Sequence, residues 1–73
     1  MAKAAECIDD LDRLDHAKKL AAQLEAMLIV TTGEAGKGFR LLSELYQNNF
    51  HWACLDIASE LVTVLDELEA HHD

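Results

Sequence analysis

The sequence of 73 residues contains no proline, and its three glycines all fall between Gly33 and Gly38. Proline breaks helices and glycine weakens them, so helix-breaking residues are confined to that single cluster. No stretch approaches the roughly 18 consecutive apolar residues that a membrane span requires. The amino-terminal residues also lack the apolar core of a signal peptide. We therefore expect a cytoplasmic protein that does not associate with membranes.

Cysteine and basic residues are also scarce. Cys7 and Cys54 are too few for a disulfide scaffold and have no metal-ligand spacing, so reduced thiols are expected. Six Lys and Arg face 14 Asp and Glu, which gives a net charge of −8 at pH 7. Such a chain repels phosphate backbones and anionic lipids. The balance argues against direct nucleic-acid or membrane binding and favours a protein partner with a basic surface.

The charge is unevenly spread along the chain. Residues 1–38 carry 7 acids and 5 bases, a net of −2, whereas residues 39–73 carry 7 acids and Arg40 alone, a net of −6. Apolar residues nevertheless make up 51% of the sequence, which excludes a disordered acidic tail. A single domain over residues 1–73 buries only about 60% of its unfolded surface. We therefore expect it to bury more by association, most simply as a homodimer.

Apolar residues before the glycine cluster recur at steps of three and four, which is the spacing of one helical face. The members of this face are Cys7, Leu11, Leu14, Ala17, Ala21, Leu24 and Leu28. The pattern predicts a helix over about residues 4–30, followed by a glycine-rich interhelical loop at 31–38.

The second half of the chain allows two interpretations. Asn48-Asn49 favours a break, because Asn prefers caps and turns. The preferred prediction is therefore a three-helix unit with helices at about 4–30, 39–47 and 49–70. The alternative is a helical hairpin with one unbroken helix from about Phe39 to Ala70. In both cases the fold is all-α, and Leu55, Ala58 and Val62 broaden the apolar face of the last helix. That helix thus has two neighbours to contact, consistent with dimerisation into a helical bundle.

Each candidate catalytic or ligand motif fails a geometric requirement. Gly33–Gly38 lacks the strand, the spacing and the hydroxyl residue of a phosphate-binding loop. His71 and His72 are adjacent on a helix and point about 100° apart, so they do not chelate a metal together. His51 and Cys54 can approach on one helix, but nothing supplies an orienting group or an oxyanion site. We expect no enzyme activity, no metal and no cofactor.

Aromatic side chains indicate a binding surface. All four aromatic residues lie between Phe39 and Trp52, and Tyr and Trp are enriched in binding hot spots. Phe50 shares the core face of the last helix, whereas Trp52 lies about 160° away from it. Trp52 is therefore either covered by the other helices or part of an interface. The predicted partner-binding residues are Tyr46, Phe50, Trp52, Asp56 and Glu60.

Several sequence motifs between Leu24 and Leu68 follow one another in an order that also occurs in other proteins. Gly33-Glu34 and Phe39 precede the segment Tyr46–Cys54, which leads into an acidic, apolar helix. This order resembles short helical proteins of pseudomonads and their phages. The resemblance implies a bacterial or phage accessory protein, but it implies no activity and no functional residues.

Two functional hypotheses follow. The first is a regulator or inhibitor that binds and masks a surface of another protein. The alternative is an acidic nucleic-acid mimic that competes for a DNA- or RNA-binding protein, with carboxylates in place of phosphates.

Overall fold

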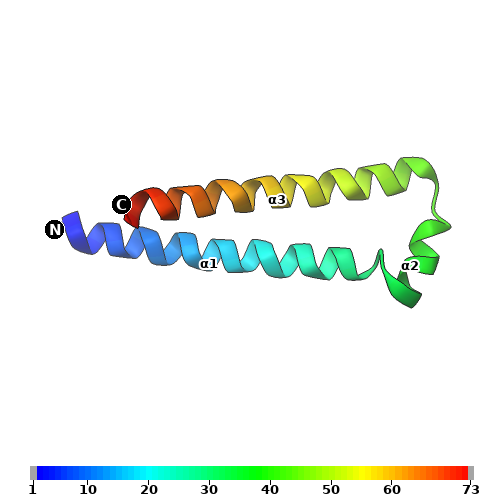
Figure 1. Ribbon diagram of the computed structural model, residues 1–73, viewed down its shortest axis with the longest axis horizontal. Helices are drawn as coiled ribbons and strands as arrows, with labels where there is room; N and C mark the ends of the chain where they lie inside the picture. Colours follow the sequence, from blue (N-terminus) through cyan, green and yellow to red (C-terminus); the bar gives the residue numbers. More distant parts are fainter. Residues whose placement is uncertain (1, 73) are drawn as a thin grey trace.

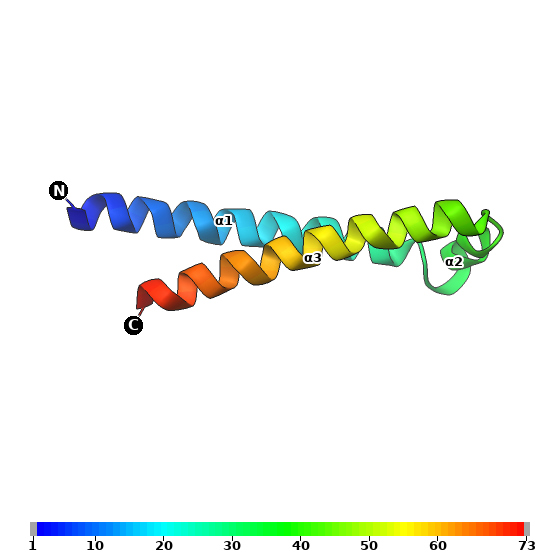
Figure 2. The same cartoon turned by 90° about the horizontal axis from the view of Figure 1, so that it is seen from above.

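The computed structural model describes the backbone of residues 2–72 and the side chains of residues 10–70. Three helices form the fold: α1 (Ala2–Ile29), α2 (Gly33–Arg40) and α3 (Glu44–His72). The two long helices run antiparallel, and α2 joins them at one end (Figure 1). Seen from above, the long helices cross at a shallow angle (Figure 2). The all-α prediction is confirmed, and the molecule is a rod of 55 × 19 × 16 Å.

The rod has two different ends. We call the end that contains α2 the loop end, and the end at which both termini lie the open end (Figure 1). None of the helices within residues 2–72 has both the length and the apolar character needed to cross a membrane.

The predicted break at Asn48-Asn49 is wrong, because α3 is continuous from Glu44 to His72. Asn costs a helix less than about 0.7 kcal/mol relative to Ala, which packing along a long helix easily offsets. The helix begins at Glu44, directly after Ser43, whose hydroxyl accepts the N–H of Tyr46 at 3.3 Å. The Gln47 side chain adds to this start by donating to the Leu42 carbonyl at 2.8 Å. The hairpin alternative is therefore the closer description, with a later helix start than expected.

The glycine-rich loop predicted at 31–38 is wrong for most of its length: Thr31 and Thr32 lie in a turn, but Gly33–Arg40 forms the short helix α2. Gly33 has the positive φ of 57° that suits glycine, and it follows Thr32, which has extended backbone geometry. Gly36 is buried, and a Cβ at this position would lie 2.5 Å from the Thr31 carbonyl oxygen. The glycines thus allow α2 to lie close against the end of α1.

The core follows the seam between α1 and α3. Ala17, Leu20 and Val64 are buried there, with three apolar side chains packed against them: Ile57, Leu61 and Leu68. At the loop end, the rings of Phe39 and Phe50 meet edge to face with their centroids 5.1 Å apart. This arrangement leaves the flanks and outer faces of both long helices uncovered within the chain.

Candidate interaction surfaces

Four of the five predicted partner-binding residues are exposed on α3. Tyr46 and Trp52 are 62% and 69% exposed, and Asp56 and Glu60 are exposed as well. Phe50 is half-buried instead, because its ring packs against Phe39. Phe50 as a contact residue stays a prediction, although part of its ring is used in packing against Phe39.

Trp52 is not covered by α1 or α2. Trp52, Asp56 and Glu60 follow one another at four-residue intervals, so they lie along one face of α3. We call these three residues the Trp52 row. Tyr46 lies about 120° from Trp52 around the helix, so it borders this row instead of continuing it.

Ion pairs join α1 to α3 on one side of the hairpin. The Arg13 guanidinium donates to Glu67 across the seam at 3.3 Å and also pairs with Asp10 at 3.3 Å. On the same side, the His16 Nε2 atom lies 3.0 Å from a Glu60 carboxylate oxygen. We call this the polar side. Arg13 and Asp10 are partly exposed and the other three groups are well exposed, so each pair stabilises the fold by less than about 1 kcal/mol.

The opposite side of the hairpin is apolar. An open groove of about 410 Å³ lies there between α1 and α3. The groove is lined by Ala21, Leu24, Glu25, Leu28, Ile29, Thr32 and Leu61. Helical spacing extends the apolar surface beyond the groove in both directions. We define the apolar side by the following residues: Leu14, Ala21 and Leu28 of α1, and Leu55, Ala58, Leu61, Val62 and Leu65 of α3.

Large side chains of the apolar side are well exposed: Leu14 40%, Leu28 44%, Leu65 48%, Val62 57% and Leu55 60%. The sequence indicated the α3 part of this surface through its broad apolar face. It did not indicate the α1 part, since Leu14, Ala21 and Leu28 were assigned to the same face as the buried Ala17. The signal was available, however, because Leu14, Ala21 and Leu28 are spaced seven residues apart, whereas buried Leu20 lies outside this series.

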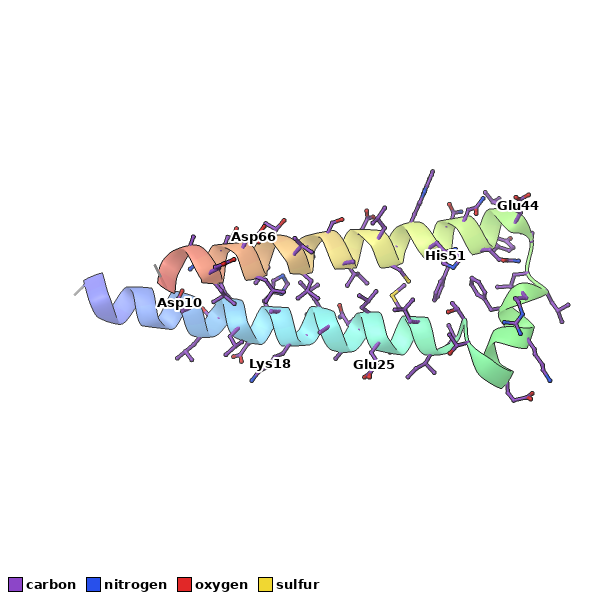
Figure 3. All side chains as sticks on the ribbon, viewed as in Figure 1. Asp10, Lys18, Glu25, Glu44, His51 and Asp66 are labelled. Carbon is purple, nitrogen blue, oxygen red and sulfur yellow. The ribbon has the colours of Figure 1, made fainter. Side chains whose placement is uncertain are left out.

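The hairpin also redistributes the charge. The loop-end half, residues 21–55, carries 3 acids and 2 bases, a net of −1. Residues 1–20 and 56–73, whose described part forms the open-end half, carry 11 acids and 4 bases, a net of −7. The −6 found for the second half of the sequence is therefore joined in space by acids of α1. Asp10 and Asp66 mark this acidic end in Figure 3.

His51 and Cys54, the histidine and cysteine considered as a nucleophilic pair, both take part in helix packing. Cys54 is buried, and the His51 ring lies 5.4 Å from that of Phe39, on the side of α3 that faces α2 (Figure 3). His71 and His72 lie outside the described side chains. Among the described residues, no group of three His, Cys, Asp or Glu is placed to hold a metal ion.

In comparisons with known proteins, the chain matches no family model, no curated protein and no solved structure.

Proposed function

We propose that this chain is a small, non-enzymatic interaction module that regulates or inhibits another cytoplasmic protein by binding and masking a basic surface. The exposed indole of Trp52 is the observation that carries the proposal. A side chain of this size is 69% exposed on a rigid helix, where little entropy is lost when a partner covers it.

Acidic groups beside the indole determine the kind of partner. Asp56 and Glu60 extend the Trp52 row towards the open end, and the whole chain carries a charge of −8. Such a field speeds the approach of a basic surface, while the indole, once the partner covers it, supplies most of the affinity.

Affinity capture from a lysate of the encoding organism tests the proposal. The tagged wild-type chain is compared with Trp52→Ala and with Leu41→Ala, which removes another exposed apolar side chain (88% exposed) from the loop end. We expect one basic protein to be retained by the wild type and by Leu41→Ala, and its recovery to fall at least about tenfold with Trp52→Ala. Equal recovery with both variants would contradict the proposed role of the Trp52 row.

A nucleic-acid mimic remains the second candidate, because the open-end half carries a net charge of −7. Carboxylates concentrated at one end of a narrow rod can occupy a groove built for phosphates. In that case Asp66→Asn with Glu69→Gln weakens capture, and added salt abolishes it. Capture that withstands salt but depends on Trp52 favours the first function.

A further inference from the structure

We propose that the apolar side takes a second copy of this chain, packed antiparallel so that α1 lies against α1 and α3 against α3 in a four-helix bundle. The inference extends the proposed function, because it assigns the dimer to a surface that leaves the Trp52 row outside the dimer seam.

The exposed area of the hairpin fits this assembly. A compact protein of 8.1 kDa exposes about 4,500 Å². This chain exposes 5588 Å², which is about 1,100 Å² more than that relation gives. A standard protein interface covers about 800 Å² per partner. A standard interface with a second hairpin on the apolar side would therefore cover most of this excess.

The α1 residues of this side form a self-complementary row. Two-fold interfaces require that residue i contacts j while j contacts i. Antiparallel α1 helices centred on Ala21 place Leu14 of each copy against Leu28 of the other. Lys18 and Glu25 flank Ala21, and both extend from α1 on the side away from α3 (Figure 3). The same register brings Lys18 of each copy opposite Glu25 of the other, and the small Ala21 side chains allow close approach.

The α3 residues of this side show the same symmetry. Leu55, Ala58, Val62 and Leu65 are spaced symmetrically about position 60, so antiparallel α3 helices pair Leu55 with Leu65 and Ala58 with Val62. The centres of the two rows must lie at one level for a single axis to serve both. Ala21 and Leu61, which lie at or next to these centres, line the same groove.

Charge selects the orientation. In a parallel dimer the two open-end halves, each with a net charge of −7, lie side by side. In the antiparallel dimer each of them lies beside a loop-end half of net −1. A helix of an unrelated protein would need neither the symmetric rows nor this orientation, so a second copy is the occupant that accounts for both.

Sedimentation of Ala21→Glu and Ala26→Glu provides the first test. Ala26 is exposed on the outer face of α1, so Ala26→Glu is the same change in the same helix away from the seam. We expect the wild type and Ala26→Glu to sediment at twice 8.1 kDa at micromolar concentration, and Ala21→Glu to sediment at 8.1 kDa. A monomeric wild type, or an Ala21→Glu dimer, overturns the inference.

A charge exchange tests the register independently of folding. Lys18→Glu should raise the dimer dissociation constant roughly tenfold, because it opposes two carboxylates at each of two equivalent places. The double variant Lys18→Glu/Glu25→Lys restores the attraction and should recover wild-type affinity. If the double variant dimerises as weakly as Lys18→Glu, the proposed register is wrong.

Cross-linking tests the direction of packing. In a chain with Cys7→Ser and Cys54→Ala, Ala21→Cys should form an intersubunit disulfide, since the two Ala21 positions meet at the axis. Ala26→Cys should not. Equal cross-linking of both rules out the axis at Ala21. Trp52→Ala should leave the dimer mass unchanged. A wild-type dimer that captures no partner, or whose capture survives Trp52→Ala, would overturn the proposed function alone. Capture by a wild-type monomer would sink this inference alone.

Discussion

The loop end and the open end of the rod are held together by different forces. At the loop end, Phe39 and Phe50 pack ring against ring, and Gly36 lets α2 lie close to the Thr31 carbonyl. At the open end, a small core around Leu20 is accompanied by exposed ion pairs such as that between Arg13 and Glu67. The stability of the loop end thus depends on close side-chain packing, whereas the open end is folded despite a large excess of negative charge. Substitutions that change volume should therefore act mainly on the first end, and substitutions that change charge mainly on the second.

The largest effect is expected from truncating the aromatic packing of the loop end. Phe39→Ala should lower the free energy of unfolding by about 3 kcal/mol, because it leaves a cavity beside Phe50. Leu41→Ala, two residues further and 88% exposed, should change it by less than about 0.5 kcal/mol. Urea unfolding followed by circular dichroism, at one fixed protein concentration, measures both. Similar losses for the two variants would show that the loop end has no specific packing.

Gly36 and Gly38 offer a sharper contrast within one helix. A Cβ at Gly36 meets backbone atoms of Thr31, whereas a Cβ at Gly38 meets nothing within 4 Å. Gly36→Ala should destabilise the protein by about 1–3 kcal/mol through overpacking. Gly38→Ala should stabilise it by roughly 0.5–1 kcal/mol, because alanine is the better helix former. Thermal unfolding of both variants should give melting temperatures on opposite sides of the wild-type value. If both substitutions raised the melting temperature, the steric explanation of Gly36 would be wrong.

The smallest effects belong to the charged open end. Glu67→Gln removes both a repulsive charge and the partner of Arg13, so its effect should stay within about 0.5 kcal/mol. Glu69→Gln, on the same helix two residues away, relieves repulsion and should be slightly stabilising at low salt. The difference between the two variants should disappear at high salt, where such charges are screened. Denaturation midpoints at two salt concentrations test this, and a difference that persists at high salt would contradict it.

Much of the fold was predictable from the sequence. The apolar repeats of three and four residues predicted long helices in both halves of the chain, because this periodicity reflects burial along a helix face. The break at Asn48-Asn49 was wrongly predicted because the weak preference of two residues was set against a 29-residue helix. The glycine cluster misled for another reason. Gly36 is needed for a close approach to Thr31, and a steric requirement of this kind depends on tertiary structure.

The candidate surfaces were predictable only in part. The sequence identified Trp52 as a residue that does not share the face of Phe50, but whether another helix covers it depends on how α2 is placed. It also identified the acids of α3 without revealing that the hairpin brings the acids of α1 to the same end. Chain order gave halves of net −2 and −6, whereas the fold produces ends of net −7 and −1. Charge per segment is read directly from a sequence, but charge per surface requires the topology.

The unequal charge of the two ends has an electrostatic consequence for encounters with other molecules. A single hairpin carries an electric dipole along its 55 Å axis, so a positively charged surface exerts a torque that turns the open end towards it. Two antiparallel copies cancel this axial dipole by symmetry and experience no such torque. A monomer would therefore approach a basic partner end-on. The proposed dimer would offer two identical ends, and short-range contacts would decide its orientation at encounter.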